Sequence, residues 1–247
     1  MSLLAHQTVL GRCLRSSDME RTIAEAVHEF AIDRERLREI GDLVRGAGFG
    51  FTRQVQRSWC MGRTAGAAQL TLSLLTIEQR RSLVGDWVDG GGGAALDVTS
   101  EAAAFLAFVG RHLPDPSHEL SVCRMEEAAY RASAAAASFT PPVLTLSDGR
   151  GVPLRQGRGS MIVYFFTDPR RLFAAITAGE PLPALGKKGF PYLFAPGLAT
   201  LRRVASCAEA RLWHRLEVPT SVPALRAEGF SRRRVMALLA VGAIERC

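Results

Sequence analysis

The chain has 247 residues, of which 47% are hydrophobic and 22% charged, a composition that suits one large globular domain or two modest ones. No apolar run approaches the roughly 20 residues that a membrane span needs, so we expect no membrane partner. The net charge of +7 raises nucleic acid as a partner, but only two of the 31 basic residues are lysine, which indicates a compositional bias towards arginine.

The N-terminus and the cysteines indicate a cytoplasmic protein. Residues 1–15 lack the basic-then-apolar order of a signal peptide, and we expect them to form a first helix. The five cysteines are scattered and no CxxC motif occurs. This pattern favours neither a zinc knuckle nor a disulfide framework and is typical of buried thiols in a reducing compartment.

Helical signals dominate the first 138 residues. Ser17 and Glu20 have the spacing of a capping box, and Asp33 is a candidate N-cap of the next helix. Further helices are expected over residues 51–75, 76–87 and 102–112, the last capped by Ser100, and from Ser117 onward. The glycine run between these helices is a flexible connection and not a phosphate loop, because no strand precedes it and no Lys-Ser/Thr follows.

The pattern changes at Thr140, where two following prolines end the helix. Residues 143–147 alternate between apolar and polar side chains, which predicts a strand. A short extended piece follows over residues 152–154, where Pro153 favours an edge position. Residues 161–166 are all apolar, which predicts a strand buried on both faces at the centre of a small sheet.

The C-terminal part returns to helices. Asp168 and the proline after it open one helix, and another is expected over residues 198–211. A helix-turn-helix pattern then joins residues 223–228 to a last helix capped by Ser231.

These elements predict an α+β chain with two domains. An all-helical domain is expected over residues 1–138. A small sheet with helices of the winged-helix type is expected over residues 139–247.

No segment carries a convincing catalytic or metal motif, and we assign neither kind of residue to this chain. GxSxG and HExxH are both missing from the sequence. The best local cluster for a metal is His118, Cys123 and Glu127 on one predicted helix. The alternative is an amphipathic helix with a buried cysteine and with carboxylates that are solvated or paired with arginine.

The helix-turn-helix leaves DNA reading open as an alternative function. Arg232, Arg233 and Arg234 begin the second helix, where a recognition helix meets DNA. Residues 235–241 are apolar almost all round, whereas a groove-reading helix needs a polar face that presents donors to base edges.

Peptide binding suits the same domain better. A short sheet with an exposed edge offers unpaired backbone groups to an added strand, and arginines beside the strands can meet acidic groups of a peptide. The alternative for each arginine is a solvated turn. The predicted peptide-binding residues are Leu144, Leu146, Arg150, Arg155, Arg158, Ile162 and Tyr164.

A resemblance to a known family enters through residues 101–132. EAAAFLAFV at 101–109, HLPD at 112–115 and CRMEEAAYRA at 123–132 resemble the end of a helical putative DNA-binding domain. That domain occurs in bacterial proteins encoded beside TIM-barrel iron enzymes of peptide-modifying pathways. The layout of a helical half before a small α+β half is similar to the MbnC family of methanobactin biosynthesis.

The resemblance implies a non-catalytic partner subunit whose winged-helix-type domain is like the recognition elements in the biosynthesis of ribosomally made, modified peptides (RiPPs). Its partner would be an MbnB-like TIM-barrel enzyme that holds the iron and uses oxygen to convert cysteines of an MbnA-like precursor peptide into oxazolone and thioamide groups. This chain would hold no cofactor and would dock the leader of the precursor peptide by strand addition. The competing predictions are a helix-turn-helix transcription regulator and an enzyme of unassigned type.

Overall fold

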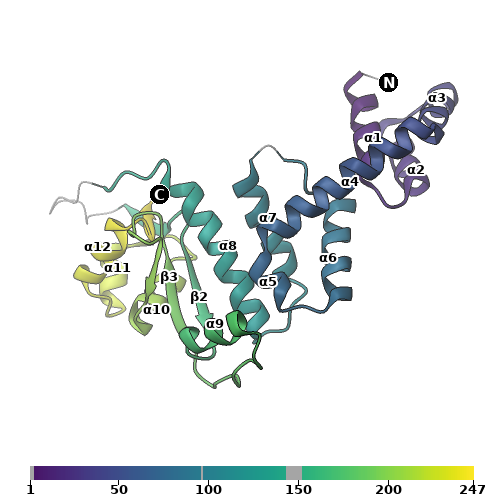
Figure 1. Ribbon diagram of the computed structural model, residues 1–247. Coiled ribbons are helices and arrows are strands. Elements are labelled where there is room, and N and C mark those ends of the chain that lie inside the picture. The colour runs from purple at the N-terminus through teal and green to yellow at the C-terminus, as the bar shows by residue number, and fades with distance from the viewer. Residues whose placement is uncertain (1–2, 96, 143–151) are drawn as a thin grey trace. The chain divides into compact units, whose positions relative to one another are not determined.

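The computed structural model describes residues 3–95, 97–142 and 152–247, which form twelve helices and two three-stranded antiparallel sheets (Figure 1). The chain divides into two compact units, an N-terminal unit of Met1–Glu101 and a C-terminal unit of Ala102–Cys247. From the sequence we expected the boundary at residue 138, after the last helix of the predicted all-helical domain. The mixed α+β class is confirmed. No helix in the described ranges is both long and apolar enough to cross a membrane.

The N-terminal unit is helical in all its described elements. They are α1 (Leu3–Arg15), α2 (Met19–Phe30), α3 (Arg34–Arg45), α4 (Ala47–Ala67), α5 (Gln69–Ser73), α6 (Ile77–Asp89) and the start of α7 (Val98–Gly110). The first helices bury one apolar stripe each around Val9, Cys13, Ala26 and Ile40. This burial is what amphipathic helices with a spacing of three to four residues achieve when they pack together.

Side chains cap α3 and α6 in this unit, and the first cap, Asp33, is the one that the sequence predicted. Asp33 accepts the backbone N–H of Arg36 at the start of α3, and Thr76 forms a capping box with Gln79 at the start of α6. Both caps satisfy backbone donors that have no partner within the helix.

Other predicted helix boundaries were wrong. The N-cap of α2 is Asp18, while Ser17 donates to the carboxylate of Asp89. Helix α7 begins at Val98 and not after Ser100, because Asp97 accepts from the backbone N–H of Thr99. The helix expected over residues 51–75 is interrupted after α4, and α5 follows as a separate short helix. In the first two cases an aspartate one or three residues from the predicted cap offered a competing acceptor.

The C-terminal unit continues from α7 and combines helices with both sheets. Its elements are α8 (His118–Ala136), β1 (Pro153–Gln156), β2 (Met161–Phe165), α9 (Pro169–Ala178), β3 (Phe190–Phe194), β4 (Arg202–Val204), α10 (Cys207–Arg215), β5 (Thr220–Ser221), α11 (Val222–Ala227), α12 (Arg232–Ala240) and β6 (Ile244–Arg246). The expected N-caps Ser117, Asp168 and Ser231 are confirmed.

The first sheet has the order β5-β1-β6, so β1 is its central strand. This corrects the expectation that Pro153 marks an edge. Pro153 is the first residue of β1, where its missing N–H removes no donor from inside the strand, and its carbonyl accepts from Cys247 at 3.0 Å.

The second sheet has the order β2-β3-β4, so β2 is an edge strand and not the centre of a sheet. Ile162 and Phe165 point to opposite faces and are only 7% and 1% exposed. Ile162 belongs to the core formed with α10 to α12, while the Phe165 ring contacts Phe173 of α9. The apolar run therefore reports two covered faces and carries no information on strand order.

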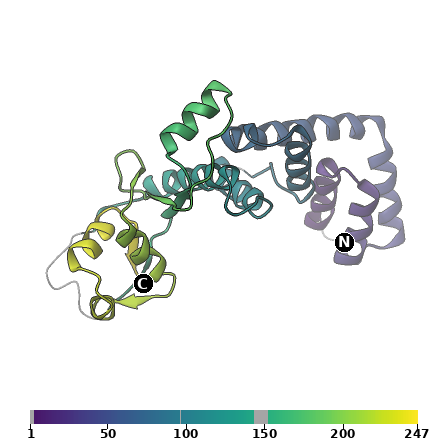
Figure 2. The same ribbon diagram turned by 90° about the horizontal axis from the view of Figure 1, so that it is seen from below.

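The C-terminal helix-turn-helix is confirmed, with α11 and α12 next to each other near the end of the chain (Figure 2). The helix expected over residues 198–211 is wrong in its first half, where β4 lies, and α10 starts only at Cys207. The last strand, β6, was not expected.

Candidate functional site

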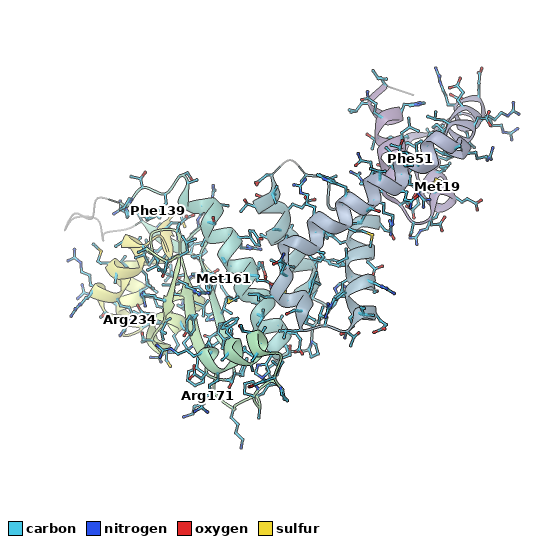
Figure 3. All side chains as sticks on the ribbon, viewed as in Figure 1. Met19, Phe51, Phe139, Met161, Arg171 and Arg234 are labelled. Atoms are coloured by element: carbon cyan, nitrogen blue, oxygen red, sulfur yellow. The ribbon has the colours of Figure 1, made fainter. Side chains whose placement is uncertain are left out.

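A groove of about 320 Å³ runs between α8 and the edge strand β2 of the C-terminal unit. Figure 1 shows α8 and β2 side by side, and Figure 3 labels Met161 at the start of the strand beside the helix. The α8 side of the groove is lined by Ser117, Leu120, Ser121 and Arg124. The other side contains four consecutive β2 residues, Met161 to Tyr164. Since consecutive strand side chains point to opposite faces, a surface lined by all four is the backbone edge of the strand.

The register of the sheet fixes which backbone groups of β2 point into this groove. Ala205 donates to Pro191 at 2.9 Å, so the odd-numbered residues of β3 bond to β4. The even-numbered residues of β3, such as Tyr192 opposite Val163, therefore bond to β2. It follows that the N–H and C=O groups of the even-numbered β2 residues point away from β3.

These outward residues are Ile162 and Tyr164, two of the predicted peptide-binding residues. No strand in the described part of the chain pairs with their edge. Together they present two N–H donors and two C=O acceptors along the groove. Such an unpaired edge is the template that an extended peptide uses when it adds to a sheet.

One end of the edge is closed by the segment before β3. The backbone N–H of Gly186 donates to the carbonyl of Phe166, the next outward position after Tyr164. The same segment is tied to α8, since Nε2 of the buried His118 lies 2.6 Å from the carbonyl oxygen of Pro183. The groove therefore ends near Phe166 and continues only past Met161.

The side chain of Tyr164 is held by α10. Its hydroxyl lies 3.2 Å from Nε2 of His214, and the two rings stack with centroids 5.8 Å apart. Nδ1 of His214 lies 3.2 Å from Glu217. Burial raises the pKa of Tyr164, with a smaller contribution from Cys207, so the phenol stays neutral and can both donate and accept.

A charged cap fixes the start of α10. Ser206 and Glu209 form a capping box, and Arg203 donates to both carboxylate oxygens of Glu209. The Arg203 hydrogen bond is the largest cause that lowers the pKa of Glu209 to about 2, assisted by hydrogen bonds from Ser206 and opposed by burial. The cap thus positions the helix that carries Trp213 and His214.

Beyond Met161, next to the groove, lies a polar pocket of about 380 Å³. Its α8 wall carries Arg124, Glu127 and Arg131, and its opposite wall is the turn before β2, which includes Arg158. Arg124 and Met161 line both the groove and the pocket, so the two spaces are neighbours along α8.

The structure brings only part of the predicted site together. Ile162 and Tyr164 line the groove. Arg155 is on the other sheet and pairs with Glu245 at 2.7 Å, so it braces β1 against β6. Arg158 is exposed at the polar pocket. The predicted residues Leu144, Leu146 and Arg150 lie outside the described residues.

The sequence missed the α8 side of the site. Arg124, Glu127 and Arg131 have the i, i+3, i+7 spacing of one helix face, which was the available signal. Nothing in the local sequence shows that β2, some thirty residues later, lies against that face.

The metal cluster considered for α8 does not assemble. Cys123 donates to the Leu106 carbonyl at 3.1 Å, and Glu127 forms ion pairs with Arg124 and Arg131. Within the described ranges, no group of three or more His, Cys, Asp or Glu side chains could hold a metal ion. Glu127 is thus the arginine-paired carboxylate of the alternative interpretation.

A larger cavity of about 460 Å³ lies beside β6 and is lined by residues that include Phe139, Leu239 and Arg246. It also includes Pro142, the last residue before the gap in the described chain.

The N-terminal unit presents a different kind of surface. Phe51, Val55 and Trp59 form an exposed apolar stripe at i, i+4 and i+8 of α4, with Phe51 71% exposed (Figure 3). The guanidinium of Arg63 lies over the Trp59 ring at 5.1 Å. Backbone groups in the interior of a helix bond to one another, so the stripe offers contact area but no backbone pairing.

No protein-family model matches this chain, and no curated protein sequence matches it significantly.

Proposed function

We propose that this chain is a non-catalytic, peptide-binding partner subunit of an iron-dependent TIM-barrel enzyme of the MbnB type. The complex would modify cysteines of a ribosomal precursor peptide to oxazolone and thioamide groups, as in the biosynthesis of methanobactin, a copper chelator. The chain itself would bind the leader of the precursor peptide. The iron and the oxygen chemistry belong to the partner enzyme.

The observation that carries the proposal is the open edge of β2 inside the groove. The outward N–H and C=O groups of Ile162 and Tyr164 can form up to four hydrogen bonds with an extended peptide of about three residues. Residues Leu120 and Met161 flank this edge and can contact alternate side chains of the added strand. Main-chain pairing supplies affinity for many sequences, and the flanking side chains supply selectivity.

The arrangement of the other sheet supports the winged-helix comparison. Helix α10 precedes β5, the helix pair α11–α12 follows, and β6 returns to pair with the central strand β1. A helix-turn-helix packed on a small antiparallel sheet is the architecture expected of a winged-helix recognition element. We propose that this part of the unit is the scaffold that supports the groove.

Backbone pairing can be tested by proline substitution. Twelve-residue random peptides displayed on phage are selected against the full chain, and an enriched peptide is synthesised with a fluorescent label. Tyr164→Pro removes an outward N–H and should weaken its binding at least about tenfold. Tyr164→Phe keeps the ring and the backbone and should bind as the wild type does.

The matched control is on the opposite edge of the same sheet. Val204 of β4 is exposed and its N–H also points away from β3, so Val204→Pro makes the same chemical change outside the groove. Circular dichroism checks that both proline variants are folded. Equal loss of binding in both variants, or no enriched peptide at all, contradicts peptide binding at β2.

The partner is tested by co-expression with a TIM-barrel iron enzyme of the MbnB type. We expect a stable complex on size-exclusion chromatography, with iron found in fractions that contain the enzyme. Failure of the two chains to co-purify contradicts the proposed complex even if peptides still bind.

DNA reading stays the second candidate because Arg232 and Arg233 are exposed at the start of α12. Beyond that first turn the exposed residues of α12 are Ala237 and Ala240, which offer no side-chain donors to base edges. A steep fall of duplex affinity with rising salt would favour this candidate.

A further inference from the structure

We propose that the polar pocket next to the groove, lined by Arg124, Arg131 and Arg158, recognises a carboxylate side chain of the bound peptide. This inference rests on the proposed function and deepens it by naming the chemistry that the peptide must carry. The peptide would have an Asp or Glu a short distance beyond the segment that pairs with β2.

The lining of the pocket carries an excess of positive charge. Arg124, Arg131 and Arg158 face one carboxylate, that of Glu127, among the lining residues. Arg158 lies 3.9 Å from Glu245, but that carboxylate already bonds Arg155. Guanidinium groups match a carboxylate with paired N–H donors, so an acidic side chain is the complementary ligand.

Glu127 prepares two of these arginines for binding. Its side chain is only 1% exposed, and each of its oxygens is used once, by Arg124 at 2.8 Å and by Arg131 at 2.6 Å. Each guanidinium has five N–H donors, and one ion pair leaves most of them available. The side chains of Arg124 and Arg131 are 35% and 50% exposed, so a peptide can reach them. Glu127 already holds both side chains in place, which lowers the entropic cost of binding.

The opposite wall of the pocket, the turn before β2, can lie close to α8 because it contains a glycine. Gly159 has a φ of +76°, and a Cβ at this position would lie 2.5 Å from Cβ of Ala135 and 2.7 Å from the carbonyl oxygen of Arg131. Only glycine permits this approach of the turn to the helix. The floor is equally fixed, since the Trp213 indole donates to Ser160 at 3.0 Å. The pocket is therefore a built part of the fold.

The geometry of strand addition leads a peptide into this pocket. The edge is closed at Phe166, so a peptide paired with Ile162 and Tyr164 continues past Met161. An extended chain advances about 3.4 Å per residue. The turn before Met161 is at most a few residues long, so the acidic residue should lie within about three residues of the paired segment.

The test uses the random twelve-residue phage library on the full chain and compares the selected sequences. The wild type should enrich peptides with Asp or Glu at a constant distance from an extended apolar segment. The double variant Arg131→Gln/Arg158→Gln should still select the apolar segment but lose the acidic position. Arg171→Gln, an exposed arginine of α9 outside the groove and the pocket, is the matched control (Figure 3).

Binding of one wild-type-selected peptide then measures the contact. Replacing its acidic residue by the amide should weaken binding to the wild type about tenfold and leave binding to the double variant unchanged. Equal loss in both proteins, or no acidic enrichment, overturns the carboxylate pocket while peptide binding itself stands. If no peptide is enriched, or if the enriched peptides bind Tyr164→Pro as tightly as the wild type, the proposed function fails instead.

Discussion

The two units present two different surfaces to a partner. In the N-terminal unit, the α4 stripe of Phe51, Val55 and Trp59 is apolar and exposed, and the backbone beneath it is bonded within the helix. In the C-terminal unit, the groove side of β2 exposes backbone groups, while the neighbouring side chains Ile162 and Phe165 are buried. A stripe of side chains recognises apolar shape, whereas an open strand edge recognises an extended backbone. The proposed recognition of an extended peptide therefore rests on the second unit.

The largest expected difference between the two surfaces is in how much a substitution changes the free energy of unfolding. Phe165→Ala removes a buried ring that packs against Phe173 and Tyr192, and should lower the free energy of unfolding by about 3–5 kcal/mol. Phe51→Ala removes an exposed ring and should change it by no more than about 0.5 kcal/mol. Urea unfolding of the two variants measures both. A comparable cost at Phe51 would show that the α4 stripe is covered in solution.

The wall of the polar pocket depends on one backbone conformation. Gly159→Ala places a methyl group against Ala135 and Arg131 at a positive φ, and should destabilise the C-terminal unit by about 3 kcal/mol. Thermal unfolding gives the shift, and peptide affinity of the folded fraction should fall as well. An unchanged melting temperature would mean that the turn does not approach α8 as described.

Acid should weaken the helix that supports the groove. The folded-state pKa of Glu209, about 2, lies below its ordinary value of 4.5, so its ion pair stabilises the fold above pH 4.5 and this contribution is lost as the pH falls towards 2. The loss should be about 2 kcal/mol, since solvent screens part of the interaction. Urea unfolding at successive pH values measures it. Glu209→Gln should be less stable at neutral pH and should lack this part of the acid dependence, and an identical pH profile would contradict the role of Glu209.

The smallest effect is expected on the open face of α4. Gly62 has no atom within 4 Å of the position where a Cβ would lie, so Gly62→Ala adds a methyl group without a clash. Alanine is the better helix former by about 1 kcal/mol, so this variant should be more stable than the wild type. Differential scanning calorimetry would detect the rise. A fall in stability would reveal a neighbour packed against this helix face.

The sequence predicted local structure well because local structure depends on neighbouring residues. Asp33, Ser117, Asp168 and Ser231 cap helices as expected, since each acts on a backbone group three or fewer residues away. The errors at Ser17 and Ser100 have the same origin, because an aspartate one or three residues away offered a competing acceptor.

The arrangement of strands could not be predicted in the same way. The apolar run of β2 indicated two buried faces correctly, but its edge position depends on the order in which β2, β3 and β4 pair. Pro153 misled in the opposite direction, since the first residue of a central strand tolerates proline as well as an edge does. The candidate site combines Arg124 with Tyr164, and only the tertiary fold brings these residues to one groove.

The closed end of the groove has a consequence for where a bound peptide can stop. A strand that adds to an open edge can slide by two residues and restore the same pairing on the same face. At Phe166 the next pairing position is already taken by Gly186, so a step in that direction would lose hydrogen bonds. In the proposed complex the edge would therefore set one stopping point for the peptide, and the position of every bound residue would be fixed relative to Phe166. A subunit with this property would hold the part of the peptide that follows the bound segment at a constant number of residues from the groove, whatever the sequence of that part.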